Sequence, residues 1–297
     1  MTEMNNIFHS EINSGSDNNK LSLDFTPLTI DENKPGNYDN YLRTSLFHIL
    51  KIKRHFLNTM PQTHFQDNIN QNYIDKISDK NKKILLLDLD ETLIHADFFE
   101  ENPEKYKDKY DIIISFYSEE PSNNNNDNTD NNTTDDESKD DSNEKVLNKV
   151  GIFLRPNVKE FLKEISNYFE IGIFTASLPE YADAVINYLD PDEKIIKFKL
   201  YRNNCVNVGD LVRMKDLRIF GENNLDRIVL LDNNIYSFSA QLSNGILINS
   251  FFCDKNDDEL ANVKKYLIEY IFPSDDVRKI NEQFFGFETI LNEFAKI

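Results

Sequence analysis

A short apolar run that ends in two acidic residues constrains the fold more than any other feature of this sequence. Residues 82–87 read KKILLL and residues 88–93 read DLDETL, so Asp88 and Asp90 directly follow four apolar positions. A strand that is apolar at consecutive positions is typical of a parallel sheet covered on both faces. Acidic side chains at the end of such a strand are costly unless something compensates them. The sequence therefore predicts an α/β fold in which this strand end meets a metal ion, a ligand or the surface.

The rest of the chain repeats this design, because short apolar runs alternate with segments in which apolar residues recur at helical spacing. Strands that alternate with helices in this way favour a doubly wound, mostly parallel sheet. Two further runs flank a polar insertion and predict a β-hairpin. The predicted sheet strands are 82–87, 170–176, 227–233 and 245–250, the predicted helices are 158–169 and 179–189, and the predicted hairpin strands are 111–117 and 150–156.

Low-complexity sequence sets the predicted domain boundaries. Residues 1–40 are rich in Asn, Ser and Asp, which predicts a disordered tail, and residues 41–79 predict an amphipathic helix and a linker. Residues 80–297 form the main predicted domain, with an acidic low-complexity insertion at 118–148. Because loop-closure entropy grows slowly with length, a hairpin tolerates such an insertion. The insertion is interpreted as a spacer, although its acids could also guard the entrance to a site.

The segment 41–60 combines an apolar stripe, which includes Leu46 and Ile49, with a basic cluster at 51–55. Two interpretations remain open for this helix. It either docks on the main domain, or it binds a membrane surface or an acidic partner.

Charge and cysteine usage exclude several classes of protein. The net charge is −19, and residues 119–144 contain ten acids and one lysine. Such an acidic chain disfavours direct binding to nucleic acid. Two cysteines cannot build a disulfide framework, and no Cys-x-x-Cys pair predicts a zinc site. Since neither a secretory leader, a mitochondrial presequence nor a membrane span is evident, the sequence predicts an intracellular protein without a transmembrane segment.

Three of the predicted strands end in polar groups. Asp88 and Asp90 follow the first, Thr175 and Ser177 the second, and Asp232 with Asn233 the third. In an open α/β sheet, ligands bind at the carboxyl ends of the strands, so these groups should share one crevice. Several carboxylates together require a cation, and an all-oxygen set suits Mg²⁺ better than zinc.

Six stretches, taken in order, resemble the haloacid dehalogenase superfamily. The similarity is greatest to the small phosphatases of the RNA polymerase II C-terminal domain, also called the nuclear LIM-interactor-interacting-factor family. It covers residues 80–295. DLDETL matches the signature of phosphatases with an aspartate nucleophile, and the full set is LDLDETLIH (87–95), LRPNVKEFL (154–162), FTASLPEYADAVINYLD (174–190), YRNNCV (201–206), KDL (215–217) and LLDN (230–233).

The resemblance implies a Mg²⁺-dependent protein serine/threonine phosphatase that passes through an aspartyl-phosphate. Asp88 would be the nucleophile and Asp90 the general acid and base, an assignment that fits their spacing because alternate residues on a strand point the same way. Thr175 and Lys215 would bind the phosphoryl group. The implied Mg²⁺ site consists of the Asp88 carboxylate, the Asp90 main-chain carbonyl and Asn233, with Asp232 beside them.

Other residues in these stretches have structural or alternative interpretations. Arg202 either contacts phosphate or fixes a loop, and these readings stay open. Arg155 and His95 are interpreted as structural. By resemblance, an apolar pocket should receive a proline beside the phosphoserine, and its candidates are Ile114, Phe116 and Phe153.

The sequence also departs from the family pattern at two places. The stretch DNNIYSFS, from Asp232, lacks the proline expected soon after Asp-Asn, and Phe251-Phe252 replaces a usual Trp-Phe pair. These changes could alter the loop that follows the acid-ended strand.

The family resemblance also implies a class of substrate and a cellular location. The expected substrate is a phosphoserine or phosphothreonine protein, such as the RNA polymerase II C-terminal domain, and the expected location is the nucleus, with the cytoplasm as the alternative. One competing hypothesis is a catalytically silent binding module on the same fold, like the phosphatase-like subunit of the presequence translocase. Another is a nuclear-envelope type of phosphatase that acts on a different phosphoprotein.

Overall fold

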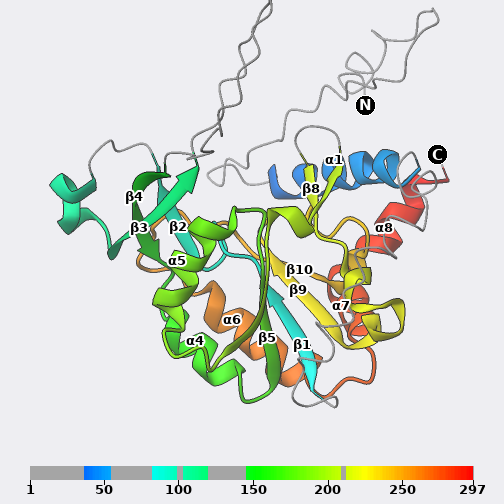
Figure 1. Cartoon of the computed structure of the whole chain (residues 1–297). Coiled ribbons are helices and arrows are strands. Elements are labelled where there is room, and N and C mark those ends of the chain that lie inside the picture. Colours follow the sequence, from blue (N-terminus) through cyan, green and yellow to red (C-terminus); the bar gives the residue numbers. More distant parts are fainter. Residues whose placement is uncertain (1–36, 55–81, 99–102, 120–144, 209–211, 297) are drawn as a thin grey trace, which may run out of the picture.

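Within the described residues, the central sheet has five strands, all paired in parallel, in the order β10-β9-β1-β5-β6 (Figure 1). The structure is a computed structural model that describes residues 37–54, 82–98, 103–119, 145–208 and 212–296. The chain starts in the middle at β1, moves outward through β5 and β6, and then returns to the other side through β9 and β10. This order confirms the predicted doubly wound sheet. The strands are β1 (Lys83–Leu87), β5 (Phe169–Phe174), β6 (Ile196–Leu200), β9 (Ile228–Asp232) and β10 (Gly245–Leu247).

Both faces of the sheet are covered, as the consecutive apolar positions of β1 predict. Leu85 and Leu87 join a core formed with α4 (Val158–Ile165), α5 (Pro179–Leu189) and α6 (Glu259–Tyr266). Ile84 and Leu86 face the opposite way, into a second core. That core also contains residues of α1 (Asn37–Ile52), α8 (Phe287–Phe294) and the hairpin of β7 (Val206–Val208) with β8 (Val212–Met214).

Shorter helical elements complete the described chain. They include a π-helix, and α7 lies between it and α8. The elements are η3 (Pro103–Lys109), η4 (Arg202–Asn204), η5 (Leu217–Phe220), η6 (Glu222–Arg227), η7 (Leu242–Asn244), the π-helix η8 (Leu267–Ile271) and α7 (Val277–Phe285).

The predicted hairpin is present and belongs to a separate antiparallel sheet of order β2-β4-β3, which stands beside α5 at one side of the molecule (Figure 1). β3 (Ile112–Glu119) pairs with β4 (Lys145–Leu154) from Ile112↔Ile152 to Glu119↔Lys145. The acidic insertion between them lies outside the described residues, apart from its ends in the two strands. β2 (Ile94–Asp97), which the sequence did not predict, pairs with β4 and ties this sheet to the segment after DLDETL.

Element boundaries differ from the predictions in three places. α1 begins at Asn37, inside the predicted disordered tail, because the carbonyls of its first turn can accept hydrogen bonds from the amides of the next turn even where the side chains are polar. Phe169 opens β5 and does not end the preceding helix, since α4 stops at Ile165. β10 ends at Leu247 instead of residue 250, because only three of its residues pair with β9.

α1 docks on the main domain, which is the first of its two interpretations. Leu46 and Ile49 are fully buried, and Phe47 meets Phe294 of α8 edge to face with ring centroids 6.4 Å apart. The basic residues at its end also bind within the chain. Lys53 forms a 2.7 Å ion pair with Glu288, and the cluster's remaining member, residue 55, lies outside the described chain. In the described parts of the chain, no helix combines the length and apolarity that crossing a membrane requires.

Candidate functional site

The polar ends of three strands meet at one edge of the central sheet. β1 lies between β9 and β5, so Asp88 has Asp232 on one side and Thr175 on the other. The backbone continues the sheet pattern one residue further, because the Asp88 amide donates to the Leu231 carbonyl at 2.9 Å. The parallel arrangement therefore brings together residues that are 57 to 144 positions apart, as the sequence predicted.

Lys215 is the cation of this site. Its ammonium donates to Asp88 Oδ1 at 2.5 Å and to Asp232 Oδ2 at 2.6 Å, and its side chain is only 1% exposed. Burial lowers the pKa of Lys215, but the charges of Asp232 and Asp88 raise it by more, so the lysine stays protonated. The pKa of Asp232 is raised by burial and by Asp88, against the opposing effect of Lys215. Two buried acids thus share one buried cation.

Asp90 points to the other side of the site, toward α5. Ser177 donates its hydroxyl to Asp90 Oδ2 at 2.6 Å, and Tyr181 donates to Oδ1 at 2.5 Å. Burial raises the pKa of Asp90 to about 6, although both hydrogen bonds work against this rise. Burial and the charge of Asp90 also raise the pKa of Tyr181, so its hydroxyl remains a donor. A carboxyl group with a pKa near 6 can exchange a proton close to neutral pH.

The turn that carries these acids is tightly held. Glu91 has a left-handed backbone with φ of 56°, which a non-glycine residue adopts only when its surroundings hold it there. The Leu89 carbonyl accepts the amides of Leu93 and Ile94, at 2.9 and 3.1 Å. From outside the turn, the Phe251 amide donates to the Glu91 carbonyl at 2.8 Å. These contacts fix the directions in which Asp88 and Asp90 point.

The site offers a set of hard oxygen ligands for a cation. The Thr92 hydroxyl lies 3.3 Å from both Asp88 Oδ2 and Asn233 Oδ1, so these two oxygens border the same small volume. Asn233 is further oriented by Ser250, whose hydroxyl accepts from Asn233 Nδ2 at 3.0 Å. If Asp88, Asp90 and Asp232 are all ionised, Lys215 leaves two negative charges uncompensated. The residues therefore fit a magnesium ion in ligand type and in charge.

Within the described part of the chain, no three His, Cys, Asp or Glu side chains lie close enough together to bind a metal by themselves. A Mg²⁺ site here would depend instead on Asn233 and on main-chain oxygen, which would supplement one carboxylate. Both oxygens of Asp232 are engaged, by Lys215 and by the Asn234 amide at 2.8 Å.

Thr175 and Arg202 lie on the opposite side of Asp88 from Asp232. The buried Thr175 hydroxyl accepts from the Ser177 amide at 3.0 Å, which keeps its own O–H as a donor. Arg202 donates from Nε to the Ala176 carbonyl at 2.8 Å, and its amide bonds to the Ser177 carbonyl at 3.0 Å. Arg202 therefore braces the loop after β5, and its exposed guanidinium is still at the rim of the site.

Arg155 is a structural clamp behind the turn that carries Asp88 and Asp90. Its buried guanidinium binds both oxygens of Asp257 at 2.7 Å and donates to the carbonyls of Thr92 and Asn249 at 2.9 Å. It thus joins the turn, the segment after β10 and the start of α6. His95 has a similar supporting position, with Nδ1 3.1 Å from Glu91 Oε1 and its ring stacked on Phe153.

Arg155→Lys is expected to lower the free energy of unfolding by about 2 kcal/mol, because a lysine keeps the charge but cannot bridge four acceptors. Denaturant unfolding measures this change. The matched control is Arg278→Lys, in an Asp276 pair whose arginine side chain is 41% exposed, where we expect a much smaller effect. Equal losses at both positions would contradict the clamp.

Sequence reasoning missed two residues that touch the site. The sequence places Ser177 among the polar strand-end residues but predicts no role for it, and it predicts no site role for Tyr181. Tyr181 lies one turn before Val185 on the buried face of α5, so its position resembles that of a core residue. One sequence feature could have indicated its role: its hydroxyl group lies in the first turn of a helix that starts directly after the polar end of a strand.

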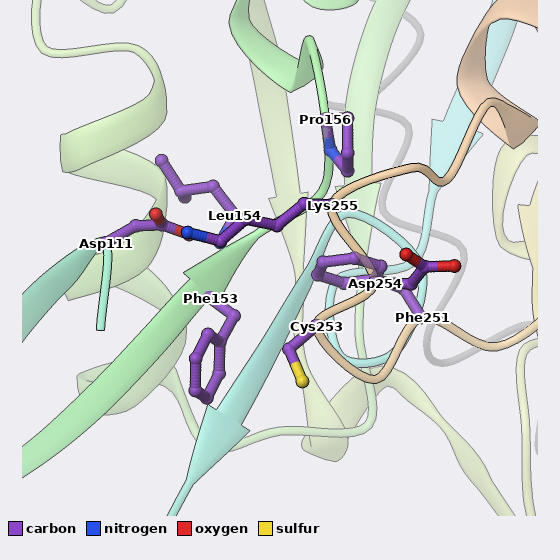
Figure 2. A pocket seen from close by; sticks show the side chains of 8 residues that line it. All are labelled: Asp111, Phe153, Leu154, Pro156, Phe251, Cys253, Asp254 and Lys255. Atoms are coloured by element: carbon purple, nitrogen blue, oxygen red, sulfur yellow. The ribbon is translucent and has the colours of Figure 1, made fainter. Parts of the chain in front are cut away.

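Of the three candidates for an apolar pocket, Ile114 and Phe116 belong to one hydrophobic cluster, and Phe153 lies apart from them. Ile114 is buried in the core, and Phe116 packs against Tyr181 with centroids 5.7 Å apart, beside the half-exposed Phe98. Phe153 points to the opposite face of the hairpin sheet. There it borders a hollow of about 220 Å³, which Figure 2 shows. The hollow is lined by Asp111, Phe153, Leu154, Pro156, Phe251, Cys253, Asp254 and Lys255.

Comparison with known proteins identifies the family. Residues 83–278 match the sequence profile of the NLI interacting factor-like phosphatases. The chain belongs to this family. It is 33% identical over 205 residues to phosphatase PSR1 of Saccharomyces cerevisiae, a match over 68% of this chain and 40% of the relative. It is 30% identical over 206 residues to CTD nuclear envelope phosphatase 1B of Danio rerio, over 67% of this chain and 71% of the relative.

A shorter match has a higher sequence identity. CTD small phosphatase-like protein 2 of Dictyostelium discoideum is 44% identical over 124 residues, which is 42% of this chain and 21% of the relative. This match covers about a fifth of that protein's length, and the match to PSR1 covers two fifths of that protein. The NLI interacting factor-like phosphatases belong to the haloacid dehalogenase superfamily, so the predicted family and α/β fold are confirmed.

Proposed function

We propose that this chain is a Mg²⁺-dependent protein serine/threonine phosphatase that uses Asp88 as its nucleophile. One observation carries the proposal: Lys215 holds the Asp88 carboxylate at the end of β1, while Ser177 and Tyr181 hold Asp90, two residues away, in a separate environment. Two carboxyl groups with different partners can perform two different tasks. Membership of a phosphatase family supports the same reading.

In the first step, an oxygen of Asp88 attacks phosphorus and the bond to the serine oxygen breaks. The protonated Asp90 gives its proton to the departing alkoxide, so the serine leaves as a neutral alcohol. Lys215 and the Thr175 hydroxyl stabilise the negative charge on the phosphoryl oxygens. The products of this step are an aspartyl-phosphate and an ionised Asp90.

In the second step, the ionised Asp90 takes a proton from water as the water oxygen attacks phosphorus. The bond to Asp88 breaks, inorganic phosphate leaves, and both carboxyl groups return to their starting states. The same residue thus serves as acid and then as base, a use that a pKa of about 6 suits.

Asp88, the Asp90 main-chain carbonyl and Asn233 would hold Mg²⁺, with Asp232 next to them. When bound, the ion supplies positive charge that lowers repulsion between the phosphoryl oxygens and Asp88. Asp232 also holds Lys215 against the site through its 2.6 Å ion pair.

The substrate class we propose is a phosphoserine or phosphothreonine segment of a protein, with the RNA polymerase II C-terminal domain as the leading candidate. Phe98 and Phe116 pack on the buried Tyr181, whose hydroxyl donates to Asp90, and we propose that the exposed Phe98 and the partly buried Phe116 receive an apolar residue next to the phosphoserine. Arg202, at the rim, is proposed to contact the substrate as well. The acidic charge argues against nucleic acid as a partner, and a nuclear location is proposed from the family.

The test is hydrolysis of 4-nitrophenyl phosphate and of phosphoserine peptides by the full chain, with Mg²⁺ and after treatment with a chelator. We expect activity that disappears with the chelator and returns with Mg²⁺. A folded, Mg²⁺-loaded protein without activity on either substrate would overturn the proposal and favour the silent binding module. Activity on peptides unrelated to the polymerase repeat would remove only the proposed substrate.

Asp90→Asn is expected to slow hydrolysis of a phosphoserine peptide by about 10³-fold but to slow formation of the phosphoenzyme from 4-nitrophenyl phosphate far less, since only the poor leaving group needs a proton. In the wild type, phosphoenzyme formation from the peptide should fall as the pH rises through about 6, because Asp90 is protonated below its pKa and ionised above it. Rapid-quench kinetics over a range of pH measures both effects. Asp183→Asn, on the half-exposed face of α5, is the matched control, and equal losses for the two substrates would contradict the role.

A further inference from the structure

α1 lies outside the region that matches the phosphatase family, yet it is packed into the fold. The match begins at residue 83, whereas α1 ends at Ile52. Its main helical partner, α8, begins at Phe287, beyond the end of the match at residue 278. Figure 1 shows α1 beside α8, and residues of the β7–β8 hairpin belong to the same buried cluster as α1. Two elements absent from the matched region thus pack on each other and on the sheet.

α1 also covers the loop that follows β9. Leu46 and Ile49 share one buried cluster with Ile235 and Tyr236 of this loop. His48 Nδ1 lies 3.4 Å from the Tyr236 hydroxyl, which is part of a side chain only 4% exposed.

The same loop holds two functional residues by its backbone. The Asn234 amide donates to Asp232 Oδ1 at 2.8 Å, and the Asn234 side chain accepts the Tyr236 amide at 3.1 Å. On the other side of the loop, the Ser237 carbonyl accepts the Lys215 amide at 2.7 Å. A displacement of the loop would therefore move Asp232 and Lys215 relative to Asp88.

We infer that α1 is a positioning element of the catalytic site and that Tyr236 is the positioning residue through which it acts. The inference deepens the proposed phosphatase function and rests on it. The loop lacks a proline that would restrict its backbone. The burial of Ile235 and Tyr236 in the same cluster as α1, together with the contact between Tyr236 and His48, provides that restriction instead. The functional domain of this chain accordingly starts at α1 and not at β1.

If α1 only stabilised the fold, a change in its contacts would have different effects. It would change the free energy of unfolding, but the folded protein would keep its loop order and its turnover number. A positioning element must change both, because a catalytic group displaced by a fraction of an ångström slows the chemical step more than it weakens substrate binding.

The experiment compares the full-length wild type with Tyr236→Ala and Tyr236→Phe, and Tyr270→Ala serves as the control. Tyr270 belongs to η8, is 44% exposed and lies outside the loop and the site. Hydrogen–deuterium exchange of residues 233–240 is measured by mass spectrometry without Mg²⁺, at a temperature well below unfolding. Mg²⁺-dependent hydrolysis of 4-nitrophenyl phosphate then gives kcat and KM for each protein.

For Tyr236→Ala we expect loop exchange at least about threefold faster and kcat about tenfold lower, with KM within about twofold of the wild type. Tyr236→Phe should recover most of both losses, because the ring keeps its contacts, and Tyr270→Ala should match the wild type. If Tyr236→Ala unfolds, Tyr236→Leu replaces it, because leucine keeps apolar volume but lacks the ring. A faster loop and a lower kcat in Tyr236→Leu support the inference, and wild-type values in that variant overturn it.

If Tyr236→Ala has a lower thermal stability but unchanged loop exchange and unchanged kcat, α1 only stabilises the fold and the inference is overturned. The exchange readout also separates this inference from the proposed function. If the wild type hydrolyses no phosphate ester, the phosphatase proposal fails, whereas faster exchange at 233–240 in Tyr236→Ala still supports positioning of Asp232 and Lys215.

Discussion

Asp88→Asn should lower kcat for every phosphate ester by roughly 10⁴-fold or more, without unfolding the protein. An amide oxygen of the same shape cannot form a stable acyl phosphate, so the first step has no nucleophile. The fold should persist, because Lys215 keeps its 2.6 Å ion pair with Asp232 and loses only one of its two acidic partners. Thermal unfolding and steady-state kinetics on the same preparation measure the two effects.

A direct readout of the covalent step strengthens this test. Acid quenching of the wild type during turnover, followed by peptide mass spectrometry, should find a phosphoryl group on the peptide that contains residue 88, and Asp88→Asn should lack it. Asp192→Asn is the matched control, since the Asp192 side chain is 69% exposed and pairs only with the neighbouring Lys194 in the described structure. Persistent phosphoenzyme or substantial activity in Asp88→Asn would assign the attack to another group.

The sequence predicts the central sheet well, because its buried strands are unusual. A run such as Leu85 to Leu87 can be accommodated only where both faces are covered, and β5 and β9 read in the same way. β6 was missed for the corresponding reason. It is an edge strand that reads IKFKL, and its two lysines, one exposed and one partly buried, give it the alternation of a half-buried strand. The short β2 was also missed, because it directly follows the turn that carries Asp88 and Asp90 in the sequence.

The site is predictable to the extent that it lies at strand ends. Asp88, Thr175 and Asp232 follow from this rule, and the structure brings them together. Lys215 does not follow from it, because the lysine comes after a short hairpin strand and only the family resemblance identified it. Tyr181 could not be identified, because a tyrosine on the buried face of a helix has the same pattern whether it fills the core or donates to Asp90.

The contact of α1 with the loop after β9 is the least predictable feature. His48 and Tyr236 are 188 residues apart, and neither belongs to a motif. The missing proline in DNNIYSFS was visible in the sequence, but its compensation by a distant helix is a property of tertiary packing. Sequence patterns describe what one segment needs to bury, and they do not specify which segment buries it.

Lys215→Met should abolish activity, with a loss of about 10³-fold or more, and should also destabilise the protein by about 3–5 kcal/mol at neutral pH. The ammonium is fully buried between Asp88 and Asp232, so its removal leaves two acids without their cation. Burial and Asp88 already raise the pKa of Asp232 while Lys215 opposes them. Without the lysine, the pKa of this carboxyl must rise further.

The pH dependence of stability gives the decisive measurement. A carboxyl whose pKa is higher in the folded than in the unfolded state stabilises the fold below its unfolded pKa, and this contribution is lost as the pH rises through the folded pKa. Lys215→Met should therefore be closer to wild-type stability near pH 5 than near pH 8. Adding Asp232→Asn removes one uncompensated charge and should restore stability at pH 8 but not activity.

Lys264→Met, which breaks a partly exposed pair with Glu164, is the control with little expected change. A Lys215→Met protein with wild-type turnover, or one destabilised equally at both pH values, would show that the lysine compensates neither the phosphoryl group nor the two acids.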